Sequence, residues 1–130
     1  MSIDIIGNFL TIIRNGIQIF GSSVVIPYSR VKHQITEVLE KEGFIKAFSI
    51  EGEGKEKIIK IDLKYVGGES AIHEITRIST PGRRTYRGTK NLPHIVGGVG
   101  IAILTTNQGI MTNKEARQRS IGGEVLCSVW

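Results

Sequence analysis

Cysteine, histidine and long apolar runs are scarce in this sequence. The only cysteine among the 130 residues, Cys127, cannot form an internal disulfide, and a lone thiol suits a reducing compartment. The three histidines, His33, His73 and His94, do not have the spacing of metal ligands. No apolar run approaches the roughly 20 residues that a membrane-spanning helix needs. We therefore expect no disulfide framework, no bound metal and no membrane span.

The motifs of common enzyme classes are also missing. The sequence contains no Gly-x-x-x-x-Gly-Lys-Ser/Thr loop, and residues 97–100 have neither the spacing of a dinucleotide fingerprint nor a helix after them. Asp4, Asp62 and the ten glutamates lie mostly on faces expected to be exposed. Cys127 stands in an apolar alternation typical of a buried structural thiol. The sequence therefore predicts a protein that is not an enzyme and needs no cofactor.

Positive charge is in excess, and it is unevenly distributed. Lysine and arginine number 17 against 12 acidic residues, which gives a net charge of +5. Residues 1–67 carry net +1 and residues 68–130 carry net +4, with Arg83, Arg84, Arg87 and Lys90 close together. A basic protein favours polyanionic partners such as nucleic acid or an anionic membrane. The alternative is that the charge only keeps the protein soluble.

The first half of the chain predicts a module of helices and strands. Apolar residues recur at spacings of three and four near the start, and later alternate with polar ones, which indicates first helix and then strand. The predicted elements are a helix from Asp4 that stops at Asn15-Gly16, a strand at 24–26 closed by Pro27, a helix capped by Ser29 and ended by Gly43, a strand at 44–50, a turn at 51–55 and a strand from Ile59 to Tyr65.

The second half predicts mainly strands. Its expected elements are a strand at 72–78, a structured loop at 79–88, a break at 92–94, an apolar strand at 101–104, a polar loop at 105–109, a short helix from a Thr112–Glu115 capping box through Arg119, a glycine loop at 122–123 and a strand at 124–130 on which Val125, Cys127 and Val129 face one way. Gly67-Gly68 is the best candidate for the boundary between the two modules. We expect an α+β fold: an N-terminal helix-strand-helix-hairpin module (1–67) packed against a mainly β C-terminal module (68–130).

Two loop segments have the composition of a binding site. In residues 79–88 a tyrosine, Tyr86, is interleaved with arginines and small hydroxyl residues. Arginine forks suit phosphates, and a tyrosine ring can stack on an unpaired base. In residues 105–109, short polar side chains follow an apolar strand and can bind base edges or 2′-hydroxyls. The alternatives are a solvated basic turn that Tyr86 anchors to the core, and an ordinary polar turn.

These residues together resemble those of a known family, small-subunit ribosomal protein eight of the bacterial type. The resemblance covers essentially the whole chain. It is carried by Gly100-Ile101-Ala102-Ile103-Leu104-Thr105-Thr106-Asn107-Gln108-Gly109-Ile110-Met111-Thr112, Glu115-Ala116-Arg117, Gly122-Gly123-Glu124-Val125-Leu126-Cys127, Trp130, Ile78-Ser79-Thr80-Pro81-Gly82-Arg83-Arg84-Thr85-Tyr86, Ile12-Ile13-Arg14-Asn15 and Glu42-Gly43-Phe44-Ile45.

The resemblance implies a structural component of the small ribosomal subunit that binds the central domain of its ribosomal RNA (rRNA). It implies neighbouring ribosomal proteins as partners and, in some bacteria, repression of its own messenger RNA. It implies RNA contacts at Thr105, Thr106, Asn107, Tyr86, Gly122, Gly123 and Glu124, with Lys55 adding backbone contacts. From their chemistry, Arg83, Arg84, Arg87 and Lys55 are expected to neutralise phosphates.

Glu124 is the unusual member of this set, because a carboxylate repels phosphate. It is expected to accept bonds from base amino groups or to orient a neighbouring side chain, the alternative being a simple surface charge. The chain departs from the family pattern in two places: Thr105-Thr106-Asn107 stands for the usual Ser-Thr-Ser, and Ile12 stands where a basic residue is common.

Other classes stay open at this point. A free RNA-binding regulator on the same scaffold and a basic module that docks an acidic protein are the alternatives. The first residues, 1–4, lack the features of a secretory signal or a transit peptide. The protein is therefore expected to act where it is made, in a bacterial cytoplasm or in the stroma or matrix of an organelle.

Overall fold

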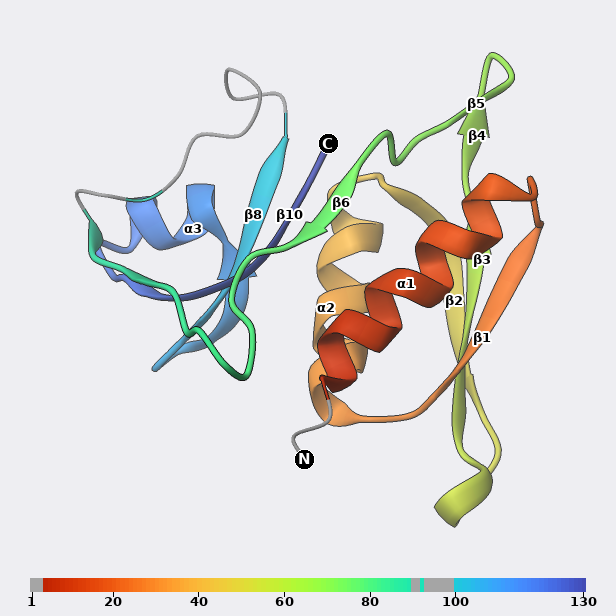
Figure 1. Ribbon diagram of the computed structural model, residues 1–130, viewed down its shortest axis with the longest axis horizontal. Coiled ribbons are helices and arrows are strands. Elements are labelled where there is room, and N and C mark those ends of the chain that lie inside the picture. Colours follow the sequence, from red (N-terminus) through yellow and green to blue (C-terminus); the bar gives the residue numbers. More distant parts are fainter. Residues whose placement is uncertain (1–3, 90–91, 93–99) are drawn as a thin grey trace. The chain divides into compact units, whose positions relative to one another are not determined.

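The chain folds into two compact units (Figure 1), and a computed structural model describes residues 4–89, 92 and 100–130. The N-terminal unit is Asn8–Ile72, and the C-terminal unit holds the described residues from His73 to Trp130 together with those before Asn8. Helices and antiparallel sheets confirm the α+β class. The predicted division at 67/68 stays a prediction. Lys90, the break at 93–94 and the glycine run at 97–99 lie outside the described residues.

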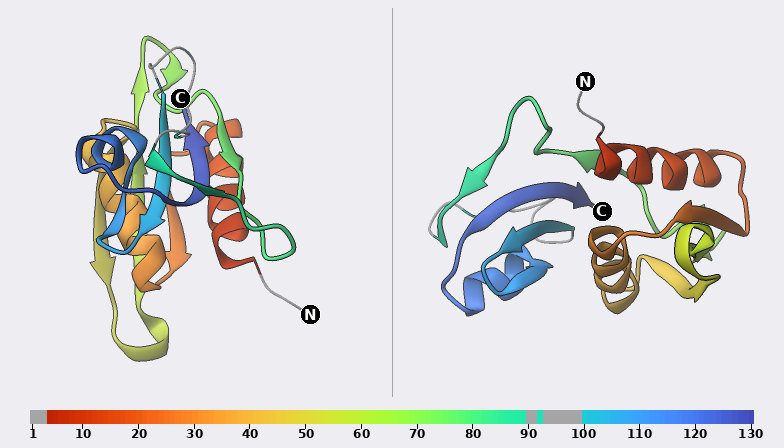
Figure 2. Two further views of the ribbon diagram at one scale, coloured as in Figure 1. Left: turned by 90° about the vertical axis from the view of Figure 1, so that its left-hand side faces the viewer. Right: turned by 90° about the horizontal axis from the view of Figure 1, so that it is seen from below.

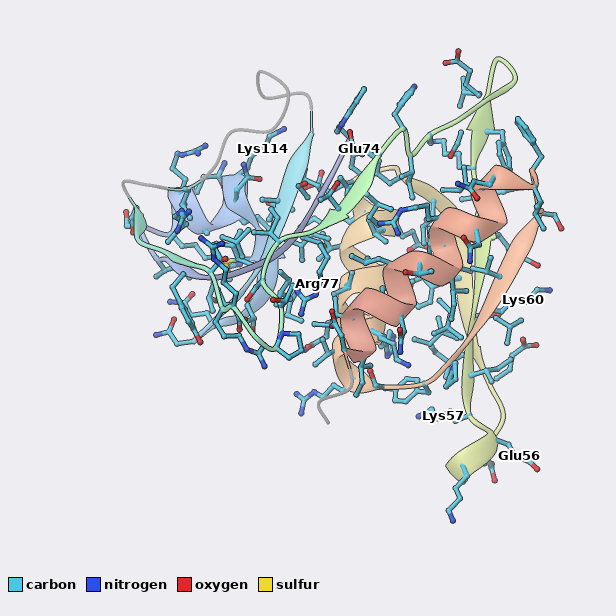
Figure 3. The ribbon with its side chains drawn as sticks, in the orientation of Figure 1. Glu56, Lys57, Lys60, Glu74, Arg77 and Lys114 are labelled. Atoms are coloured by element: carbon cyan, nitrogen blue, oxygen red, sulfur yellow. The ribbon has the colours of Figure 1, made fainter. Side chains whose placement is uncertain are left out.

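The N-terminal unit is a three-stranded antiparallel sheet, in the order β1-β3-β2, with two helices on one of its faces (Figure 1 and Figure 2). Ile59, Ile61 and Leu63 of β3 are buried, whereas Lys60 points away from the helices (Figure 3). The alternation predicted for this strand is confirmed as far as Leu63. The elements are α1 (Ile5–Gln18), β1 (Ser23–Pro27), α2 (Arg30–Lys41), β2 (Ile45–Glu51), the 3₁₀ turn η1 (Gly54–Glu56), β3 (Ile58–Leu63), β4 (Tyr65–Val66) and β5 (Glu69–Ser70).

Helix α1 runs further than its sequence predicts. The predicted stop at Asn15-Gly16 is wrong, because Gly16 is a buried packing position: a Cβ there would lie 2.4 Å from Cγ1 of Val24. The turn that ends the helix is made instead by Phe20, which adopts a left-handed φ of 51°. The amide of Gly21 then donates to the carbonyl of Gly16 (2.9 Å). A glycine that allows close packing and a glycine that ends a helix look alike in sequence.

Helix α2 begins and ends where predicted. The hydroxyl of Ser29 accepts a hydrogen bond from the amide of Lys32 (3.2 Å), as an N-cap does, and Gly43 follows the helix with φ 81°. Tyr65 was predicted to continue β3 but does not: it opens β4, which pairs with β5 across the turn Gly67-Gly68. Its hydroxyl donates to the carbonyl of Gly21 (2.8 Å), which ties the side chain to the turn after α1.

The C-terminal unit is an antiparallel sheet centred on β10, which lies between β8 on one edge and both β6 and β7 on the other. Buried side chains on one face of β8 and β10, among them Leu104 and Val125, form a core with Met111 and with Ala116 of α3. The elements are β6 (Ile75–Arg77), β7 (Tyr86–Arg87), β8 (Ile101–Thr106), β9 (Gly109–Thr112), α3 (Asn113–Gln118) and β10 (Gly123–Val129).

Strand β7, the end of β8 and the first residue of β9 were expected as loop. Thr105 and Thr106 end β8 rather than open a polar loop, so the loop shrinks to the turn Asn107-Gln108, and β9 follows at once. Tyr86 belongs to β7. These strands are short and exist through pairing with distant strands, which local patterns do not reveal. The capping box is confirmed, because the Thr112 hydroxyl accepts from the amide of Glu115 (3.1 Å).

Strand β10 contains a bulge that overturns the predicted alternation. Val125 pairs with Leu104 and Cys127 pairs with Ile103, so Leu126 is the extra residue. Paired residues share a face, and the neighbours Ile103 and Leu104 point to opposite faces of the sheet. Val125 therefore lies on the face opposite to Cys127 and Val129, although all three are buried.

Cys127 is fully buried, as predicted, and burial raises the pKa of its thiol to about 12, although the charge of Arg77 acts in the opposite direction. The folded pKa lies above the unfolded value of about 8.5. The thiol therefore contributes stability that is complete below that pH and is lost as pH rises toward 12. We expect the free energy of unfolding in urea to fall more between pH 8 and pH 10.5 for the wild type than for Cys127→Ala. Equal losses in the two proteins would contradict this.

Candidate nucleic-acid interface

An open pocket of about 360 Å³ lies where β7, the β8–β9 turn and the start of β10 meet. Within the C-terminal unit, β8 and β10 run side by side (Figure 1), which brings these segments together. Seven of the eleven residues that the sequence nominates line this pocket. The lining residues are Tyr86, Thr105, Thr106, Asn107, Ile121, Gly122, Gly123 and Glu124.

Strand register places the central three side chains. Glu124 pairs with Tyr86 of β7 on one edge and with Thr105 of β8 on the other. Side chains of directly paired residues project from the same face of a sheet. An exposed phenol ring, a carboxylate and a hydroxyl therefore stand in one row across three strands. Tyr86 is 65% exposed, which leaves its ring open to a ligand rather than anchored in the core.

The two glycines allow the backbones to approach closely at the pocket floor. A Cβ on Gly122 would lie 2.3 Å from the carbonyl oxygen of Arg87, and one on Gly123 would lie 2.3 Å from that of Thr105. Neither glycine has a positive φ, so space and not backbone conformation requires glycine at both positions. Their role as floor of the pocket follows from this packing.

The polar side chains of the β8–β9 turn differ in whether they are free to bind a ligand. The Thr106 hydroxyl donates to the carbonyl of Gly109 (2.8 Å) and accepts from the amide of Gln108 (3.1 Å), so it mainly holds the turn in shape. The side chains of Thr105 and Asn107 make no hydrogen bond to any residue that the structure describes. These two side chains are therefore the polar groups of the turn that are ready for a ligand.

Glu124 is neither a surface charge nor an isolated one. Its carboxylate side chain is 12% exposed and accepts at Oε2 from the hydroxyl of Ser79 and from Nη1 of Arg84 (3.1 Å). The same Ser79 oxygen accepts from the amide of Thr85 (3.1 Å). Glu124 thus orients neighbouring side chains, which is one of the two roles expected for it.

The arginine-rich segment of residues 79–88, the basic loop, is closed by hydrogen bonds at two levels: at its neck, where its two ends meet β10, and at its tip, around Pro81 and Gly82. Ser79 and Thr85 both bond to the backbone of Val125, and Thr80 and Arg83 exchange backbone hydrogen bonds (3.0 and 3.1 Å) around the tip. The guanidinium of Arg83 is exposed and has no partner among the described residues, whereas that of Arg87 donates to the carbonyl of Tyr86 (3.0 Å). The loop is therefore an ordered projection beside the pocket.

Lys55 is the nominated residue that belongs to the other unit. It lies in η1, the turn at the tip of the β2–β3 hairpin where Figure 3 labels Glu56, and it is exposed. Ser79 and Ile121 have roles in the pocket that the sequence reasoning missed. Only Ser79 left a usable signal, since a small hydroxyl residue between an apolar strand and Pro81 suits a buried turn.

Other kinds of site find little support in the described residues. Residues 4–89, 92 and 100–130 contain no group of three histidine, cysteine, aspartate or glutamate side chains that would hold a metal ion. In the same part of the chain, no helix has both the length and the apolar character that crossing a bilayer requires. The pocket offers hydroxyls, an amide, an open aromatic ring and nearby arginines. These are the groups by which RNA-binding proteins hold unpaired bases and phosphates.

Comparison with known proteins gives the family. The model of the family described as ribosomal protein S8 matches residues 4–130. The chain is 49% identical to the small ribosomal subunit protein uS8 of Thermodesulfovibrio yellowstonii, with 100% of both chains covered. It is 50% identical to the protein of the same name from Caldicellulosiruptor bescii, with 98% of each chain covered. The chain belongs to the ribosomal protein S8 family. This confirms the resemblance and the expectation that the protein is not an enzyme.

Proposed function

We propose that this protein is a structural constituent of the small ribosomal subunit and that it binds the central domain of the subunit's rRNA. Relatives that match over their full length carry the name small ribosomal subunit protein, which supports the first part. The observation that supports RNA binding is the pocket, which gathers seven of the residues expected to contact RNA from three separate segments. Its partners are then that RNA, neighbouring small-subunit proteins and, through a similar RNA fold, its own messenger.

The geometry suits an irregular RNA rather than a regular duplex. A-form RNA hides its base edges in a deep, narrow major groove, whereas unpaired bases can enter a pocket. Tyr86 offers a face for stacking, while Thr105 and Asn107 offer hydrogen bonds to a base edge or a 2′-hydroxyl. Asn107 replaces the usual serine hydroxyl with an amide that both donates and accepts. Arg83 and the separate Lys55 supply phosphate contacts, which make binding dependent on salt.

Thr105→Val tests the pocket, because valine keeps the shape of threonine and removes only the hydroxyl. We expect affinity for a central-domain rRNA fragment to fall about tenfold, since an RNA group left unpaired costs about 1–3 kcal/mol. Binding is measured by titration at several salt concentrations with unrelated RNA as competitor. The matched control is Thr76→Val on β6, an exposed position outside the pocket, which should bind like the wild type.

RNA binding by the wild-type protein tests the ribosomal proposal itself. If it binds the central-domain fragment no better than unrelated RNA of equal length, the ribosomal proposal fails. Weak binding that ignores RNA structure would point instead to a module that docks an acidic protein. Specific RNA binding without co-sedimentation with small subunits would point to a free regulator. Co-sedimentation supports action on ribosomes, in a bacterial cytoplasm or in an organelle.

A further inference from the structure

Arg83 and Arg84 are neighbours in sequence but differ in their surroundings. The guanidinium of Arg83 has no partner among the described residues, while that of Arg84 lies 3.1 Å from the carboxylate of Glu124. The Arg84 side chain is still 49% exposed. Of these two arginines, Arg83 is therefore available to any phosphate, whereas Arg84 is already paired beside the pocket.

The bond between Arg84 and Glu124 is not needed to close the loop. The neck is held by the Ser79 hydroxyl, which bonds both Thr85 and Glu124, and by the backbone bonds of Ser79 and Thr85 to Val125. Arg84 adds a half-exposed ion pair to a neck that is already tied. Because the Arg84 side chain is half exposed, solvent screens its attraction to the carboxylate. Closure of the loop therefore does not by itself account for this pair.

The pair does alter the electrostatics that an approaching RNA meets. Phosphates are drawn to free cations in any RNA sequence, which produces binding without specificity. Glu124 cancels the charge of Arg84 and repels phosphate at the mouth of the pocket. Its Oε1 accepts no bond from the described residues and remains open to a donor from a base. An RNA that brings only phosphate to this site is repelled by the Glu124 carboxylate. An RNA that inserts a base can instead donate a hydrogen bond to it.

We propose that Glu124 is a specificity-determining residue that holds Arg84 back from indiscriminate phosphate binding. The inference rests on the proposed function and adds a mechanism of selectivity to it. RNA that fills the pocket satisfies Glu124 through a base amino group, whereas a regular duplex cannot release Arg84 without leaving the charge of Glu124 with only the Ser79 hydroxyl as partner. Discrimination arises here partly from a repulsive element, as specificity often does.

The test uses Glu124→Gln in the full-length protein. The glutamine oxygen can still accept from Ser79, so the neck should hold, and thermal melting checks this. We expect affinity for an unrelated RNA duplex to rise about three- to tenfold, with the slope of log affinity against log salt steeper by about 0.7–0.9, one extra phosphate contact. Glu40→Gln is the control, because it removes the same charge from an exposed position on α2.

Substitutions of the two arginines make the test sharper. Arg84→Gln should leave the salt slope of duplex binding unchanged, because Glu124 already holds that cation away from phosphate, whereas Arg83→Gln should flatten the slope by about the same 0.7–0.9. In the double variant Glu124→Gln with Arg84→Gln, the gain of Glu124→Gln should disappear. Such non-additivity is the signature of two side chains that act through one contact.

The outcomes separate this inference from the proposed function. If Glu124→Gln behaves like Glu40→Gln on the duplex, or if the double variant keeps the steeper slope, Glu124 does not restrain Arg84. These duplex measurements decide the inference whatever the central-domain fragment does. Failure of the wild type to prefer that fragment would instead remove the ribosomal proposal.

Discussion

Gly123→Ala should lower the free energy of unfolding by about 2 kcal/mol and abolish tight RNA binding, because the new methyl group has no space. Its Cβ would lie 2.3 Å from the carbonyl oxygen of Thr105 and 3.0 Å from Cγ2 of Thr106. Backbone cannot yield as a flexible side chain does, so β8 and β10 must separate where the pocket forms. Urea unfolding and titration with the central-domain fragment measure the two effects.

Gly82→Ala provides the matched control for that substitution. Gly82 lies at the tip of the basic loop, nothing is within 4 Å of its Cβ position, and its φ is not positive. The same added methyl group should leave stability within about 0.5 kcal/mol of the wild type. If Gly123→Ala were as stable as Gly82→Ala, the close approach of the two strands would not be a requirement of the fold.

Leu104→Ala should have a comparable or larger effect on stability, a loss of about 2–5 kcal/mol, without touching a ligand group. Leu104 has no exposed surface and packs with Val125, Met111 and Ala116 in the core of the C-terminal unit. Its truncation leaves a cavity directly beneath the residues that carry the pocket. The midpoint of urea unfolding, followed by circular dichroism, measures the loss.

Val66→Ala is the control for this second substitution, because Val66 is 65% exposed in the short β4 strand of the other unit. Its loss should stay within about 0.5 kcal/mol. RNA affinity of Leu104→Ala, measured at a temperature where the variant is folded, should be close to that of the wild type. A small stability loss for Leu104→Ala would show that the core residues can collapse into the space.

Local signals in the sequence were enough to predict much of the fold. Ser29 and Thr112 cap their helices as predicted. The hydroxyl accepts a hydrogen bond from an amide two or three residues later, so this interaction is short in sequence. The alternation from Ile59 to Leu63 is local in the same sense. Gly16 shows the limit, since its neighbour Val24 is known only once the chain has folded.

Features that depend on strand pairing could not be predicted. β7 and β9 are two and four residues long, and they exist because β10 and β8 lie beside them. The composition of the segments around residues 79–88 and 105–109 did point to the pocket. The ion pair of Arg84 with Glu124 joins residues forty positions apart, and no pattern in the sequence indicated which arginine would be held.

The bulge at Leu126 makes the length of β10 matter as much as its composition. Before the extra residue, Val125 faces the core around Leu104, and after it Cys127 faces the opposite way. A substitution in this strand changes the packing of one side chain only. A deletion would exchange the faces of every residue on one side of it, because each step along a strand reverses direction. Strand β10 should therefore tolerate many substitutions better than it tolerates the insertion or deletion of one residue.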